Sequence, residues 1–121
     1  MARILIVDDD KHIVAILNEL LLIDGHYVEA AYNATDAFEL ATQENFDLIL
    51  TDILMPTVDG IEFIKAIRQN SNIPIVAMSG GRRAVTAEFN LDSAELLGVR
   101  AVLTKPFTVE QLREALQKAG F

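Results

Sequence analysis

The sequence predicts an α/β domain with a doubly wound, five-stranded parallel sheet and five helices. Short apolar runs rich in β-branched residues alternate with longer segments of helical periodicity, and this strand–helix pair occurs five times. The apolar runs are nearly continuous, which is typical of strands buried on both faces of a parallel sheet. Neither a linker nor a repeat interrupts the alternation, so we expect one domain over residues 1–121.

The first strand is predicted at Arg3–Val7, and Asp8-Asp9-Asp10 comes directly after it. The first helix is predicted at Lys11–Ile23. Its expected core-facing residues are Ile13, Ile16, Leu17 and Leu20. Val14 and Leu21 widen this apolar stripe, which fits either a broad core face or a surface for a partner.

The second and third strands differ in the residues at their carboxyl ends. Tyr27–Ala31 has no polar cluster after it, so we expect it at an edge of the sheet. Asn33 can cap the next helix, which is predicted to run to about residue 44. The third strand, at residues 47–51, ends on Asp52. A helix is predicted at 59–69, since Asp59 and Glu62 have the spacing of a capping box.

The last third of the chain supplies the remaining strands, at 75–78 and 101–103. Gly80 and Gly81 disfavour helix, so we expect a loop there, and the fourth helix begins anywhere between residues 84 and 92 and ends at Gly98. Thr108 and Gln111 form a capping box that opens the final helix.

The composition excludes several classes of protein. Hydrophobic residues make up 51% of the chain, which is too many for a disordered protein. No apolar run approaches the roughly 20 residues that span a bilayer. The first residues show no secretory signal, so we expect a cytoplasmic protein with no membrane partner. The net charge of −8 argues against binding of nucleic acid by this domain.

Four of the predicted strands end next to polar residues that could form one site. These residues are Asp8-Asp9-Asp10, Asp52, Ser79 and Lys105. Ligands of parallel sheets bind at the carboxyl ends of the strands, where the strand order reverses. We therefore expect the four strand ends to converge on Asp52.

The acidic residues indicate a site for a divalent cation. Carboxylates that lie close together repel one another unless a cation lies among them, and Mg²⁺ prefers hard oxygen ligands. If Asp8, Asp9 and Asp52 share one ion, the first and third strands must be neighbours. The alternative is that these acids only cap the following helix, a role that suits Asp10.

With a cation bound, Asp52 can act as a nucleophile toward a phosphoryl group and form an acyl phosphate. Phosphoryl transfer needs its equatorial oxygens neutralised, which Lys105 could do together with the metal. Ser79 offers a hydroxyl donor. The alternative interpretations are a solvated surface lysine and an ordinary turn serine.

Together these residues resemble the receiver domain of two-component response regulators, of the single-domain type found in chemotaxis regulators. The resemblance covers the chain from end to end. The matched pieces are Asp8-Asp9, Asp52 with Met55-Pro56 and Asp59-Gly60, Ser79, and Lys105-Pro106-Phe107.

The resemblance implies a flavodoxin-like fold with strand order 2-1-3-4-5. Asp52 would be the phosphoacceptor, and Ser79 and Lys105 would hold the phosphoryl oxygens. Mg²⁺ would be bound by Asp9, Asp52 and the main-chain carbonyl of Leu54, while Asp8 would act largely through water. The Lys105–Pro106 bond would be cis.

The resemblance also implies a signalling switch that catalyses only its own phosphorylation and dephosphorylation. The donor would be a histidine kinase or a histidine phosphotransfer protein, and the target an unidentified protein. We expect a monomer or weak homodimer. Two departures concern the output of the switch: Val102 stands where the family often has an aromatic residue, and the segment between Ser79 and Lys105 is long. We therefore expect the loop and the fourth helix to report phosphorylation.

Two other functions fit the pattern less well. A phosphatase resembling the haloacid dehalogenase group would use Asp8 and Asp10, but it would leave Asp52 without a role. A flavodoxin-like flavin binder needs a phosphate loop after the first strand, where three aspartates would repel the phosphate. His12 and His26 lie in different elements, which favours ordinary surface or helix-end histidines over a phosphohistidine carrier or a metal ligand.

Overall fold

In the computed structural model, residues 2–53, 60–80 and 98–121 are described. The elements in chain order are β1 (Arg3–Val7), α1 (Lys11–Ile23), β2 (Tyr27–Ala31), α2 (Ala34–Gln43), β3 (Leu48–Asp52), α3 (Gly60–Arg68), β4 (Ile75–Gly80), β5 (Ala101–Lys105) and α6 (Val109–Lys118). The predicted fourth helix and the Asp59–Glu62 capping box depend on residues outside the described part.

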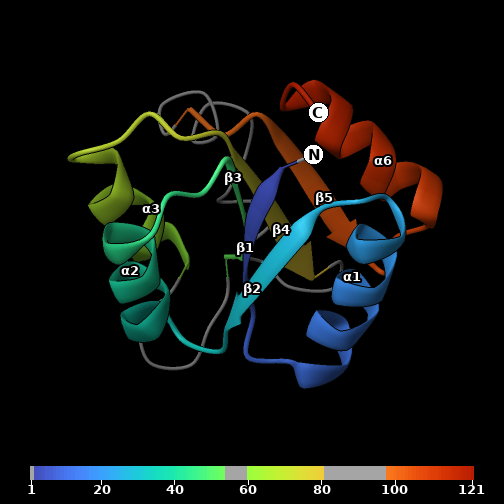
Figure 1. The fold of residues 1–121 in the computed structure, drawn as a ribbon, viewed down its shortest axis with the longest axis horizontal. Coiled ribbons are helices and arrows are strands. Elements are labelled where there is room, and N and C mark those ends of the chain that lie inside the picture. The colour runs from blue at the N-terminus through green and yellow to red at the C-terminus, as the bar shows by residue number, and fades with distance from the viewer. Residues whose placement is uncertain (1, 54–59, 81–97) are drawn as a thin grey trace.

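The five strands form one parallel sheet in the order β2-β1-β3-β4-β5, which confirms the predicted order. β2 lies at an edge, as the absence of a polar cluster after it predicted, and β5 lies at the other edge. The strands point the same way, so their carboxyl ends share one side of the molecule (Figure 1).

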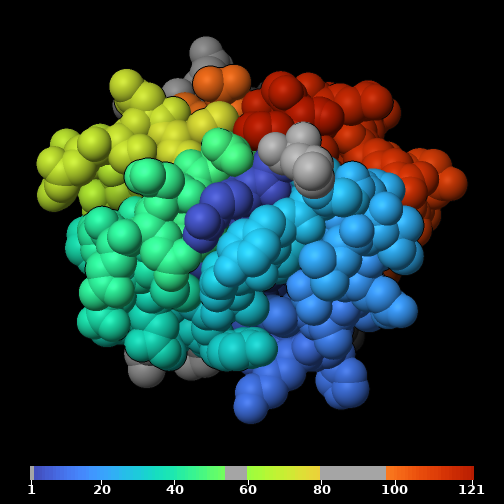
Figure 2. All heavy atoms as spheres, viewed as in Figure 1, coloured from blue at the N-terminus to red at the C-terminus, as the bar shows by residue number. Residues whose placement is uncertain are grey.

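The helices form a layer on each face of the sheet. Alternate residues of β1 show how both faces are buried: Ile4 and Ile6 pack toward α1 and α6, while Leu5 and Val7 pack toward α2 and α3. Figure 2 shows the helices closing over the sheet, with the edge strand β2 visible between α1 and α2. Among the described helices, none has both the length and the hydropathy needed to cross a membrane.

The start signals of three helices are confirmed. Asp10 caps α1 by accepting hydrogen bonds from the backbone N–H groups of His12 and Ile13. Asn33 caps α2, and Thr108 and Gln111 form the predicted capping box of α6. These side chains satisfy N–H groups that the first turn of a helix leaves without an intrahelical partner.

The core face of α1 agrees with the prediction only in part. Leu17 is buried as predicted, and Ile13 and Leu20 are partly buried against the same core, but Ile16 is 50% exposed. Val14 and Leu21 are fully packed into the core. The helix is apolar on several sides, so periodicity alone does not decide which stripe meets the sheet. Val14 and Leu21 are therefore core residues, not part of a partner surface.

The strand boundaries also differ slightly from those predicted. Asp52, Ser79 and Lys105 belong to β3, β4 and β5 instead of following them, and Gly80 is the last residue of β4, not part of a loop. The ladder hydrogen bonds of the sheet therefore hold the backbone of these three functional candidates.

Candidate functional site

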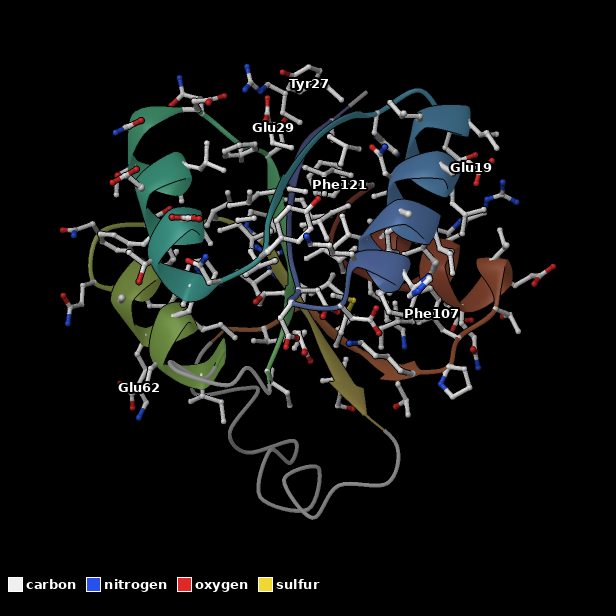
Figure 3. All side chains as sticks on the ribbon, turned by 90° about the horizontal axis from the view of Figure 1, so that it is seen from below. Glu19, Tyr27, Glu29, Glu62, Phe107 and Phe121 are labelled. Carbon is white, nitrogen blue, oxygen red and sulfur yellow. The ribbon has the colours of Figure 1, made fainter. Side chains whose placement is uncertain are left out.

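The candidate site lies at the carboxyl end of the sheet, where the chain switches from one side of β1 to the other. β1 and β3 are paired neighbours, with Val7 opposite Thr51. This confirms the adjacency that a shared cation between Asp8, Asp9 and Asp52 requires. Figure 3 looks onto this edge of the sheet, with Phe107 on the α1 and α6 side and Glu62 on the α2 and α3 side.

Three carboxylates converge at this edge. Asp8, Asp9 and Asp52 each offer an oxygen, and these oxygens lie within 4.8 Å of one another. Asp8 and Asp52 are buried and Asp9 is exposed. This set of hard oxygen donors, open on the side of Asp9, fits Mg²⁺ with part of its water shell retained.

The Asp8 carboxylate is held by two donors. Its Oδ1 accepts a hydrogen bond of 2.9 Å from the backbone N–H of Asp10, and its Oδ2 accepts one of 2.6 Å from Lys105. Burial raises the pKa of Asp8 above its ordinary value, and the hydrogen bonds from Lys105 and Asp10 offset only part of that rise. Without a bound metal ion, the charged form of Asp8 therefore costs free energy at this position.

Lys105 is the cationic member of the site. Its ammonium nitrogen lies 2.6 Å from Oδ2 of Asp8 and 3.6 Å from Oδ2 of Asp52, and its side chain is 18% exposed. The interpretation of Lys105 as a solvated surface lysine is therefore wrong. The bond between Lys105 and Pro106 is cis, as the resemblance implied.

Ser79 is a buried residue of β4, not a turn serine. β4 pairs with β3 so that Met78 lies opposite Asp52, which places Ser79 at the carboxyl end of the neighbouring strand. Ser79 is also opposite Thr104 of β5, next to Lys105. Strands β1, β3, β4 and β5 thus each bring a candidate residue to the same edge.

Gly60, which the sequence marked only as part of the matched Asp59-Gly60 piece, lies against the backbone of the phosphoacceptor candidate. A Cβ at this position would overlap the carbonyl oxygen of Asp52 and would lie 2.5 Å from Cα of Ile53. The Gly60 N–H donates to the carbonyl of Ile53 at 3.1 Å. The first turn of α3 therefore packs directly on the end of β3, which only glycine allows.

Thr51 is a second residue whose role was missed. It is fully buried, and its hydroxyl donates a hydrogen bond of 3.0 Å to the carbonyl oxygen of Asp52. The only sequence signal was a hydroxyl residue in the otherwise apolar run before Asp52.

The other predicted residues have varied outcomes. Leu54, Met55-Pro56 and Arg82-Arg83 lie outside the described residues. His26 has a structural contact, since its Nδ1 accepts a hydrogen bond from the backbone N–H of Ala2 at 3.1 Å, and His12 is exposed. Val102 is 41% exposed on β5.

Comparison with protein families gives one match over most of the chain. The family model of the response regulator receiver domain matches residues 4–117. Among curated proteins, the chain is 34% identical over 112 residues to a homolog of the transcriptional regulatory protein CpxR from Haemophilus influenzae, covering 93% of this chain and 47% of that protein. It is 35% identical over 116 residues to the transcriptional regulatory protein KdpE from Staphylococcus aureus, covering 96% and 48%. The chain thus spans about half the length of these relatives.

Solved structures agree with this match. The chemotaxis response regulator CheY4 of Vibrio cholerae superposes with a TM-score of 0.85 at 31% identity, covering 98% of both chains. A CheY-like response regulator receiver domain protein from Methanospirillum hungatei gives a TM-score of 0.83 at 28% identity, covering 98% of this chain and 92% of that one. Both similarities extend over nearly the whole sheet and its helices.

Proposed function

This chain belongs to the response regulator receiver domain family, and we propose that its Asp52 accepts a phosphoryl group from a phosphohistidine with the help of Mg²⁺. Receiver domains act in phosphorylation-dependent signalling by two-component systems. The observation that carries the proposal is the convergence of Asp8, Asp52 and Lys105 from three strands, with the Lys105 ammonium 3.6 Å from the Asp52 carboxylate.

Each residue of the site would have a separate role in the phosphoryl transfer. An oxygen of Asp52 attacks the phosphorus, the bond from phosphorus to the histidine nitrogen breaks, and that nitrogen keeps the electron pair and takes a proton from solvent. Mg²⁺, when bound by Asp9, Asp52 and the Leu54 carbonyl, with Asp8 acting largely through water, would neutralise charge on the transferring group. Lys105 supplies the second positive charge.

Ser79 and Lys105 then hold the acyl phosphate. The Ser79 hydroxyl at the end of β4 can donate to one phosphoryl oxygen and the Lys105 ammonium to another. The ammonium has three N–H donors, so Lys105 can bind a phosphoryl oxygen while it still donates to Asp8. Hydrolysis by water at the same site returns Asp52 to its free form, so the domain would catalyse only its own phosphorylation and dephosphorylation.

The signal would leave the site through the fourth helix and β5. Val102 is exposed on β5 and carries no ring, so a large aromatic rotation at this position is not available as the readout. We infer that Ser79 and the following segment report phosphorylation. Hydrogen exchange with and without a phosphoryl mimic would test this, and unchanged exchange at residues 80–91 would contradict it.

The partners follow from this role. The donor would be a histidine kinase or histidine phosphotransfer protein in the cytoplasm, and the target a protein, because the domain's net charge of −8 opposes nucleic acid. Two of the matched relatives are transcriptional regulators about twice as long. A DNA-binding function, if the natural protein has one, would belong to a further domain.

Labelling with a small phosphodonor tests the proposal. The wild type with acetyl phosphate and Mg²⁺ should gain one base-labile, acid-stable phosphate, and Asp52→Asn should gain none. Asp47→Asn is the matched control, because Asp47 lies at the opposite end of β3 and accepts a hydrogen bond from the Arg3 N–H. Equal labelling of the wild type and Asp52→Asn would overturn the proposal.

A further inference from the structure

Thr51 is a buried polar residue that the proposed reaction does not use. The buried polar or charged residues of the described part of the chain are Asp8, Thr51, Asp52 and Ser79. The other three belong to the site. A buried hydroxyl costs free energy unless it is hydrogen-bonded. The partner of Thr51 therefore identifies what this hydroxyl does.

That partner is the carbonyl oxygen of Asp52, at 3.0 Å from Oγ1 of Thr51. Side chains of a strand alternate between faces, and Ile49 belongs to the core under α2 and α3 while Leu50 belongs to the core under α1 and α6. Thr51 therefore lies on the α2 and α3 face, opposite the Asp52 side chain. It cannot touch a phosphoryl group on Asp52 and can act only through the backbone.

The peptide group between Asp52 and Ile53 is held on both sides. Its oxygen accepts the Thr51 hydroxyl, and its N–H donates to the carbonyl of Met78 at 3.0 Å. Gly60 packs against the same peptide group from the first turn of α3. The orientation of this peptide group sets the backbone angle ψ of Asp52. Contacts that hold the peptide group therefore also hold the direction in which the Asp52 side chain extends from the end of β3.

We propose that Thr51 is a positioning residue for phosphoryl transfer: its hydroxyl holds the Asp52 carbonyl and thereby aims the Asp52 carboxylate. This role rests on the function proposed above. Valine has the same shape and suits a buried strand at least as well. Packing alone therefore does not require a hydroxyl here. The simpler interpretation is that the Asp52 carbonyl only provides a hydrogen-bond acceptor for the buried Thr51 hydroxyl, and that this hydroxyl has no effect on phosphorylation.

The test compares variants with and without the hydroxyl. Thr51→Val removes it with little change of shape, Thr51→Ala removes it without placing a methyl group against the carbonyl, and Thr51→Ser keeps it. Thr42→Val is the matched control, because the Thr42 hydroxyl donates to the Glu39 carbonyl at 2.9 Å on α2, away from the site. The readouts are the maximal rate of phosphorylation by acetyl phosphate and the Mg²⁺ concentration for half that rate, each corrected for the folded fraction.

Loss of the hydroxyl should displace the Asp52 carboxylate. The maximal phosphorylation rate of Thr51→Val and Thr51→Ala should then fall by on the order of tenfold, since small displacements of reacting groups slow a reaction strongly. Thr51→Ser should stay within about twofold of the wild type, because its donor can still meet the carbonyl. Thr42→Val should label at the wild-type rate. If Thr51→Val does not fold, the comparison of Thr51→Ala with Thr51→Ser decides the matter.

Wild-type rates per folded molecule in both hydroxyl-free variants would overturn the inference and leave Thr51 with a purely structural role. An equally slow Thr51→Ser would also overturn it, because the methyl group and not the hydroxyl would then matter. These outcomes leave the phosphorylation of Asp52 intact. A wild type that takes no label would overturn the proposed function, and the role of Thr51 with it.

Discussion

The ammonium of Lys105 lies 2.6 Å from the carboxylate of Asp8, although 97 residues separate the two in sequence and β3 and β4 separate their strands. It also lies 3.6 Å from the Asp52 carboxylate. The same lysine thus neutralises the buried acid of β1 and stands beside the predicted phosphoacceptor of β3. Removing this lysine should therefore lower both the stability of the domain and the rate of phosphoryl transfer.

Lys105→Gln should destabilise the metal-free domain by about 3 kcal/mol, because it leaves the buried Asp8 carboxylate without its cationic partner. Urea unfolding without Mg²⁺ measures this. Lys65→Gln is the control. Nζ of Lys65 lies 3.9 Å from Oε1 of Glu62, and the two side chains are 58% and 62% exposed. An ion pair this exposed contributes little, so the free energy of unfolding should change little. Equal stability of the two variants would show that Asp8 does not depend on Lys105.

Asp9→Asn should abolish the stabilisation of the domain by Mg²⁺. In the wild type, Mg²⁺ at 100 times its dissociation constant should add about 2.7 kcal/mol to the free energy of unfolding. Without metal, the variant should be at least as stable as the wild type, because it removes one of three converging negative charges. Glu19→Gln, which removes an exposed charge from α1, should keep the full response to Mg²⁺ in thermal unfolding. A full response in Asp9→Asn would contradict the metal site.

Gly60→Ala should cost about 1–3 kcal/mol of stability and also slow phosphorylation, since the new methyl group must displace the end of β3 at Asp52. Gly120→Ala separates the two effects. Its φ of +101° makes alanine unfavourable there, but its Cβ would meet no atom within 4 Å. Gly120→Ala should therefore lose stability and keep the wild-type rate per folded molecule. A normal rate in Gly60→Ala would show that α3 does not set the position of Asp52.

The pair of Asp24 and Arg113 should give a pH-dependent contribution to stability. The Arg113 guanidinium donates two hydrogen bonds to Asp24, at 3.1 and 3.0 Å, and holds the pKa of that carboxyl below its ordinary value of 3.8. A pKa that is lower in the folded state adds stability above 3.8, and this stability is lost as the pH falls through the lowered pKa.

Arg113→Gln should therefore be less stable than the wild type near pH 7, and the difference should shrink as the pH falls below 3.8. Urea unfolding at a series of pH values measures it. Lys118→Gln is the control, because it removes the same charge from α6 and Lys118 forms no ion pair within the described residues. A difference that stays constant with pH for Arg113→Gln would rule out the contribution of this pair.

The convergence of the polar strand ends could be predicted from the residues because the local signals agreed with one another, while the full strand order came from the resemblance to receiver domains. Continuous apolar runs identified buried parallel strands, and the polar residues at their ends marked the functional edge. The need for Asp8, Asp9 and Asp52 to share a cation placed the first strand beside the third, which the pairing of β1 with β3 confirms.

The remaining features depend on contacts between distant segments. The rotation of α1, which buries Val14 and exposes Ile16, is set by packing on the sheet, and a helix with apolar residues on several sides carries little information about it. The overlap that a side chain at Gly60 would cause with Asp52 is visible only in three dimensions. The same holds for the hydrogen bond from Lys105 to Asp8, where the sequence indicated only a partner for a phosphoryl group.

Whether the phosphoryl group resides on Asp52 is decided by locating the modified residue. The wild type is phosphorylated with acetyl phosphate and Mg²⁺ and then treated with borohydride, which reduces an acyl phosphate to an alcohol. Peptide mass spectrometry should find homoserine at position 52 and unmodified aspartate at positions 8, 9 and 10. Reduction at Asp8 with an intact Asp52 would contradict the assignment of Asp52 as phosphoacceptor and favour chemistry resembling that of the haloacid dehalogenase group.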